Sequence, residues 1–221
     1  MQVSTVRSWR AHPLLWQFLG LSMGTLLSFG LLGIRIQTTG TYYFLFLVWN
    51  LFLAWIPYGI STLVSLKRPQ RSWMQLSAFC LWLLFLPNAP CILTDLFHLR
   101  PRPGVPIWMD LTLILSFAIT SLWLGMASLQ HMQKALFDHW GKWLSWATAL
   151  LILMLCSFGV YLGRFLRWNS WDILTQPQGL LQDIWSLVLG FDDGMWGFTL
   201  AFGGLLCICY LAFGLRQPAS V

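Results

Sequence analysis

The sequence predicts an all-α fold, a polytopic bundle of about six transmembrane helices with one short interfacial helix. Hydrophobic residues make up 57% of the 221 residues and charged residues only 9%, whereas a soluble domain carries about 25% charged residues. Six apolar segments approach the roughly 20 residues that a helix needs to cross about 30 Å of hydrocarbon. Fifteen Trp and five Tyr suit a protein with two membrane–water interfaces. These observations exclude a water-soluble protein.

The first apolar segment, about residues 14–34, follows a short basic leader at residues 1–13. It is too long for the core of a signal peptide and no clear small-residue cleavage site follows it. We therefore expect a retained first span, which ends in a polar turn over residues 35–41. The second span, about residues 42–66, contains Pro57 and is expected to bend there.

The third span, about residues 73–86, stops at the run Pro87-Asn88-Ala89-Pro90. This run ends the helix or breaks it, and a break at membrane depth survives only where protein or water satisfies the freed backbone groups. Helical character resumes over residues 91–99. The prolines at 101 and 103 then end it, since proline lacks a backbone donor and disfavours helix in the residue before it.

The last three spans are expected at about residues 107–129, 143–162 and 195–215, with a polar loop over 131–142. The longest connection, 163–191, includes a segment from 179 to 190 in which Gln182, Asp183 and Ser186 share a polar side. Apolar residues fill the rest, which favours a helix lying in the interface. We predict one membrane domain over residues 14–215, between the leader and a short tail at 216–221.

The charges divide unequally between the two sides that six spans define. The side with both termini receives eight basic residues and one Asp, and the other side receives five Arg and six Asp. Because cytoplasmic loops carry the excess of Lys and Arg, both termini are predicted to be cytoplasmic. The net charge of +6 is therefore explained first by the orientation of the chain in the membrane, and only second by anionic partners. We expect the lipid bilayer as the partner and no nucleic acid.

Asp95 and His98 form the first candidate site, because a spacing of three places both on one side of a helix. Such a pair can contribute to a divalent metal site, or Asp95 can orient His98 for proton transfer. The alternative is that Asp95 pairs with Arg100, Arg102 or an arginine of the other loop. One Asp and one His are few ligands for a metal, and the sequence names no cofactor.

Arg164 and Arg167 form the second candidate site, together with Asn169 and Asp172. The planar guanidinium suits phosphate or carboxylate, so one interpretation is that these residues form, with Arg100 and Arg102, an anion pocket for a lipid or glycan phosphate. The alternative is an internal salt-bridge network that ties the two loops together. Asn88 is an amide in apolar surroundings, suited to interhelical hydrogen bonding or to capping the broken helix. The remaining histidines, His12, His131 and His139, read as solvated loop residues.

The runs PNAPCILTDLFHL and YLGRFLRWNSWD resemble those of an uncharacterised bacterial family of multi-pass membrane proteins, known as a domain of unknown function. The resemblance covers about residues 20–215, with Cys91 standing where a tyrosine is expected. It implies a helical bundle in the bacterial inner membrane. It supplies no substrate, reaction or cofactor.

We expect the loops after spans three and five to meet at the extracytoplasmic face and to form a polar cluster. Asp95 and His98 are its predicted catalytic residues, and the predicted substrate-binding residues are Asn88, Arg100, Arg164, Arg167, Asn169 and Asp172. Two functions fit such a cluster. One is the binding or processing of a phosphate-bearing lipid or lipid-linked glycan. The other is a non-enzymatic transporter component or membrane assembly factor, in which the cluster is a structural salt-bridge network.

Overall fold

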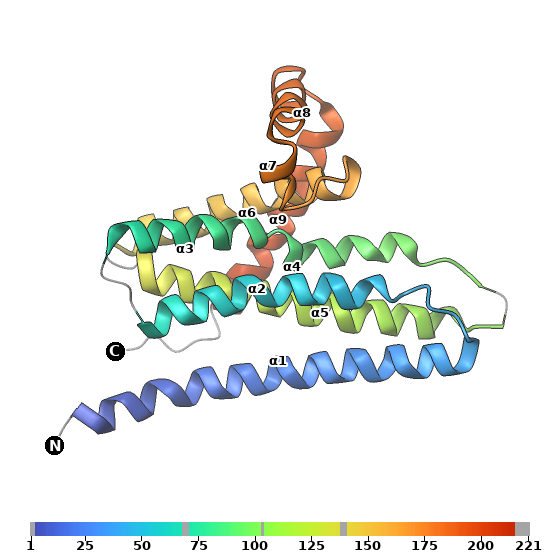
Figure 1. Cartoon of the computed structure of the whole chain (residues 1–221), viewed down its shortest axis with the longest axis horizontal. Coiled ribbons are helices and arrows are strands. Elements are labelled where there is room, and N and C mark those ends of the chain that lie inside the picture. Colours follow the sequence, from blue (N-terminus) through green and yellow to red (C-terminus); the bar gives the residue numbers. More distant parts are fainter. Residues whose placement is uncertain (1–2, 68–70, 103, 138–140, 215–221) are drawn as a thin grey trace.

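The computed structural model describes residues 3–67, 71–102, 104–137 and 141–214. This part of the chain is built almost entirely from helices (Figure 1). In chain order they are α1 Val3–Thr39, α2 Phe46–Lys67, α3 Ser72–Phe85, α4 Asn88–Cys91, the 3-10 helix η1 Ile92–His98, α5 Ile107–Met132, the π-helix η2 Gln133–Phe137, α6 Lys142–Phe165, α7 Asp172–Thr175, α8 Pro177–Leu189 and α9 Asp193–Gly214.

Six helical segments are long and apolar enough to cross a membrane, which confirms the predicted helical bundle. They are Leu14–Thr39, Phe46–Lys67, Ser72–His98, Ile107–Leu136, Lys142–Phe165 and Asp193–Gly214. Proline at 57 is accommodated inside α2. The chain is therefore a multi-pass membrane protein.

Helix α5 forms the centre of the bundle, and most of its residues are buried. One apolar core joins it to α1, α2, α4 and η1, and a second joins it to α3, α6 and α9. The basic ends of α2, α3, α5 and α6 lie together at the end of the bundle where α1 begins (Figure 1). Helix α9 also ends there, because Gly214 lies against Trp146 in the first turns of α6.

The third span is broken at its prolines, as the sequence predicts. Helix α3 ends at Phe85, and the chain continues through the single turn of α4 into η1. Neighbouring groups satisfy the break: Asn88 Nδ2 donates to the Phe85 carbonyl at 3.0 Å, and Ser121 Oγ on α5 donates to the Ala89 carbonyl at 2.6 Å. Protein, rather than lipid, thus surrounds the irregular backbone.

Two expectations about polar residues are wrong. The first helix continues to Thr39 and includes Arg35, which is only 2% exposed and is not part of a turn. His131 is not a solvated loop residue, because α5 and η2 continue to Phe137 and leave it 7% exposed. Its Nε2 lies 2.9 Å from Gln17 Oε1 and its Nδ1 lies 3.3 Å from Thr62 Oγ1, so neighbouring helices satisfy the ring.

Several residues of the charge count cannot be placed in the same way. His139, Arg68, Asp138 and Arg216 lie outside the described residues, as does the predicted tail. The predicted leader is helical from Val3 onward and continuous with the first span.

Candidate functional site

A cavity of about 650 Å³ lies where the broken third span meets the end of α6. Its walls come from α2, α3, α4, η1 and α6, and from the connection that leads to α8. The polar residues among its lining are Asn50, Asn88, Asp95, His98, Arg164, Arg167, Asn169 and Ser170. The predicted meeting of the two loops is therefore present in the structure. The chemical roles of these residues stay predictions.

The Arg164 guanidinium lines the cavity, but its hydrogen bonds go to the protein. Its Nη1 donates to Asp95 Oδ1 at 3.1 Å, and its Nη2 lies 3.0 Å from both the Thr94 carbonyl oxygen and His98 Nδ1. This one guanidinium thus holds three residues of η1 against the end of α6. The alternative in which Asp95 pairs with an arginine of the other loop is confirmed by this ion pair.

His98 is fixed in one hydrogen-bonding state by the same contact. Arginine has only donors, so His98 Nδ1 must accept and the ring proton is assigned to Nε2. Asp95 Oδ1 lies 3.9 Å from Nδ1, which is too long for a hydrogen bond. The carboxylate of Asp95 instead accepts from Arg164 and, at 3.0 Å, from Asn50 Nδ2. Asp95 is therefore not the direct orienting partner of His98.

Metal binding finds little support at this site. Within the described ranges, no three His, Cys, Asp or Glu side chains come close enough together to hold a metal ion. Cys91 also lines the cavity, but its thiol adds only one metal ligand. The cavity therefore offers hydrogen-bond donors rather than a ligand cage.

Arg167 is the exposed cation of the cavity. It lines the cavity wall, and its guanidinium makes no ion pair or hydrogen bond with the described residues. Its backbone φ is 65°, a left-handed conformation that only a few per cent of non-glycine residues adopt. The chain ends α6 there with a bond from the Trp168 N–H to the Leu162 carbonyl oxygen at 3.1 Å. A left-handed residue at this position commonly ends a helix, and here it turns the chain from α6 into the loop that lines the cavity.

Two further polar residues of this loop, Asn169 and Ser170, line the cavity and form hydrogen bonds within the protein. Ser170 Oγ donates to the Leu84 carbonyl oxygen at 3.0 Å and accepts from Asn88 Nδ2 at 3.2 Å, so it joins the loop to α3. Asn169 lies at the exposed edge, where its Nδ2 donates to Asp172 Oδ2 at 3.2 Å.

The structure places Asp172 and Arg100 away from the cavity lining. Asp172 accepts the Asn169 N–H at 2.7 Å, and this hydrogen bond lowers the pKa of its carboxyl group below the ordinary value. The side chain therefore shapes the loop from outside. Arg100 is exposed and forms no ion pair within the part of the chain that the structure describes.

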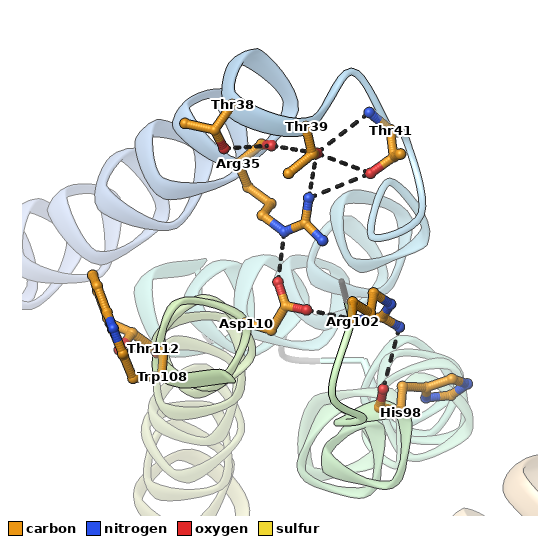
Figure 2. Close-up of polar contacts among 9 residues, drawn as sticks. All are labelled: Arg35, Thr38, Thr39, Thr41, His98, Arg102, Trp108, Asp110 and Thr112. Carbon is orange, nitrogen blue, oxygen red and sulfur yellow. Dashed lines mark hydrogen bonds and ion pairs between the residues drawn. The ribbon is translucent and has the colours of Figure 1, made fainter. Parts of the chain in front are cut away.

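A second polar cluster beside η1 contains Arg35 and Asp110, which were not predicted as site residues, and Arg102, which was expected in the anion pocket or beside Asp95 and instead pairs with Asp110. The carboxylate of Asp110 on α5 accepts two charge-assisted hydrogen bonds, one on each oxygen (Figure 2). Arg35 Nε donates to Oδ1 at 2.5 Å, and Arg102 Nη1 donates to Oδ2 at 2.6 Å. The Arg102 guanidinium also lies over the Tyr43 ring, with Cζ 4.1 Å from its centroid, and Nη2 lies 3.5 Å from the His98 carbonyl oxygen. One signal in the sequence pointed to this cluster: Arg35 lies on the side of the predicted bundle where the charge bias disfavours arginine, so a partner such as Asp110 was needed.

Comparison with known proteins gives the family of this chain. A family model described as "Protein of unknown function (DUF1361)" matches residues 49–209. No curated protein and no solved structure matches the chain. The matched range covers well over half of the chain and includes all cavity-lining residues. The chain is therefore a multi-pass member of the DUF1361 family of membrane proteins.

Proposed function

We propose that the protein binds the phosphate of a membrane lipid or of a lipid-linked glycan in this cavity. The observation that carries the proposal is the guanidinium of Arg167, which has no partner among the described residues, in a cavity whose other two ionic groups, Arg164 and Asp95, neutralise each other. The cavity therefore holds an excess positive charge. Guanidinium is well suited to phosphate because its planar fork donates two parallel hydrogen bonds.

Further donors surround this charge. His98 presents its Nε2–H, since Nδ1 is occupied by Arg164, and Asn169 adds an amide at the cavity edge. In this proposal His98 donates a hydrogen bond from its Nε2–H to a phosphate oxygen, and Asp95 acts only by holding Arg164. The role of Asp95 thus becomes positional rather than catalytic.

The rest of the lining supports an amphiphilic ligand. Apolar side chains from four elements complete the walls: Trp49, Leu53, Leu83, Leu84, Val160 and Leu180. Binding pockets commonly combine apolar walls with a few well-placed polar groups. A ligand with a charged head and an apolar chain satisfies both parts of this cavity, whereas free phosphate satisfies only one.

The charge distribution supports an extracytoplasmic position of the cavity, and the resemblance of the two sequence runs implies a bacterial inner membrane. Lys67, Arg71, Lys134 and Lys142 lie at the end of the bundle opposite to the Asp110 cluster. Under the positive-inside rule the basic end is cytoplasmic, so the cavity opens toward the outer leaflet and both termini lie inside.

The second candidate function is the non-enzymatic one, in which the cluster serves only structure. Arg164 favours it, because the hydrogen bonds of its guanidinium are spent within the protein. Transport gains less support, since the second apolar core, with fully buried Trp82 and Leu206, fills the bundle between the cavity and the basic end.

The test compares Arg167→Gln with Arg100→Gln in purified protein. Arg100 is a matched control, being an exposed arginine outside the cavity lining. Binding of dihexanoyl phosphatidic acid is measured by calorimetry, with inorganic phosphate as a second ligand. Hydrogen bonds to charged groups contribute about 1.5–3 kcal/mol, so Arg167→Gln should weaken lipid binding roughly 10- to 100-fold while Arg100→Gln leaves it unchanged.

Two results would contradict the proposal. Equal weakening by both variants means that general positive charge, and not the cavity, attracts the lipid. Inorganic phosphate binding as tightly as the lipid means that the apolar walls do not recognise a chain.

A further inference from the structure

Helices α7 and α8 carry an apolar face without a protein partner. Leu181, Trp185, Val188 and Leu189 fall on one side of α8, at spacings of four, three and one residues. These side chains are exposed, Trp185 to 67%, and Leu174 on α7 is exposed to 83%. Such a stripe is too large and too continuous for scattered surface residues and marks a surface that contacts something apolar.

The opposite face of α8 explains why the apolar stripe points outward. Leu180 is buried and lines the cavity, and Asp183 Oδ2 accepts from Trp168 Nε1 at 2.9 Å. Gly179 completes the contact, since a Cβ there would lie 3.2 Å from the Trp168 indole. Trp168 thus fixes the rotation of α8, and the stripe cannot turn inward.

Phe191, just after α8, adds an independent observation. Its backbone φ is 48°, and its ring is 75% exposed. This left-handed conformation ends α8, where the Asp192 N–H bonds back to the Leu187 carbonyl oxygen at 3.4 Å. Contacts within the described part of the protein leave this ring uncovered.

The place of α8 in the fold identifies what covers the stripe. The segment joins α6 to α9 and projects from the side of the bundle, off the long axis that the spans follow (Figure 1). A segment that leaves the spans sideways in this way stays within reach of the bilayer around them. The first neighbour it meets sideways is lipid.

We infer that the apolar face formed by Leu174, Leu181, Trp185, Val188, Leu189 and Phe191 inserts into the leaflet on the cavity side of the membrane. Amphipathic interfacial helices bind by buried apolar area plus attraction of basic residues to anionic lipid. Here the second contribution is missing, since residues 168–214 contain four Asp and no Lys or Arg. The partner is therefore a neutral or zwitterionic lipid surface.

Insertion also gives the cavity a lipid-anchored wall. Leu180 and Ile173 line the cavity, while the neighbouring residues of the same two helices enter the leaflet. The cavity is thereby bordered by lipid on this side. This inference rests on the exposed face and its position, and it does not depend on the phosphate ligand proposed above.

The experiment measures the surroundings of single spin labels on the full chain in phosphatidylcholine nanodiscs. Labels are placed by Leu181→Cys and Trp185→Cys on the stripe and by Gln182→Cys beside it, after replacement of the five native cysteines. Collision with oxygen reports lipid, and collision with a water-soluble nickel chelate reports water. We expect oxygen to dominate at both stripe positions and the chelate to dominate at Gln182, without anionic lipid.

Water-like collision at both stripe positions would overturn the inference. So would a short distance between stripe labels on different molecules, which would assign the face to a second copy of the chain. Val188→Cys, on the same face, replaces either stripe variant whose melting temperature falls. Phosphate binding by Arg167 is not read in this experiment, so the two proposals fail separately.

Discussion

Replacing Asp110 by Asn tests whether the cluster in Figure 2 stabilises the fold. Asp110 and Arg35 are 1% and 2% exposed, and the carboxylate meets Arg35 Nε at 2.5 Å. Removing one partner of a buried ion pair costs about 3–5 kcal/mol, because the remaining charge is left uncompensated. The Arg102 side chain is 22% exposed, so water solvates its charge when Asp110 is removed and the loss of this second ion pair costs little. We expect a loss of about 3–5 kcal/mol, almost all of it from Arg35.

The free energy of unfolding is measured by denaturant titration in mixed micelles, for the parent chain and for Asp110→Asn. Asp193→Asn is the control, because it removes the same charge at an exposed position and should change stability by less than about 0.5 kcal/mol. The double variant Arg35→Leu with Asp110→Leu should be less destabilised than Asp110→Asn, since no fully buried charge remains unpaired and Arg102, 22% exposed, is left within reach of water. A loss below about 1 kcal/mol for Asp110→Asn would refute the reasoning.

Three further predictions concern other parts of the molecule. Arg164→Gln should cost about 3 kcal/mol in the same titration, because it leaves the Asp95 carboxylate, 3% exposed, without its cation; a neutral result contradicts the bracing role. Gly125→Ala should cost about 1–3 kcal/mol, since the new Cβ would lie 2.9 Å from Ala89 Cβ, whereas Gly197→Ala has open space and should be tolerated. The pKa of Asp172 is lowered in the folded protein, so the stabilisation from its ionised form is complete above about pH 3.9 and is lost as pH falls through the lower folded value; the protection of the Asn169 amide, measured as its hydrogen exchange relative to the intrinsic rate at each pH, should fall only in that acid range.

Composition and proline placement made the fold readable from the sequence. Apolar runs fix the spans, since hydrocarbon tolerates few charges, and the two prolines around Asn88 fix the break in the third span. The charges suggested the pairing of Asp95 with an arginine of the other loop as one alternative, and the structure shows that this arginine is Arg164. The boundaries were less readable, because Arg35 and His131 sit in the last turns of apolar runs, where a helix end cannot be told from a loop.

The division of labour among the arginines was hidden from the sequence. Arg164 and Arg167 are three residues apart and look equivalent in the sequence. In the structure the Arg164 guanidinium donates its hydrogen bonds to η1, whereas the Arg167 guanidinium faces the cavity without a partner among the described residues. The difference arises at the end of α6, where the left-handed turn at Arg167 redirects the chain. Likewise, the contact between Arg35 and Asp110 joins residues 75 positions apart, a pairing that no local pattern encodes.

That same contact has a consequence for biogenesis. Chains are made from the N-terminus at about 5–20 residues per second, so Asp110 leaves the ribosome roughly 4–15 seconds after Arg35. During this interval the first span carries near its end a guanidinium without its Asp110 counterion, and the long side chain allows that charge to reach lipid headgroups or water. The buried ion pair of the first span is therefore completed only when the fourth span arrives.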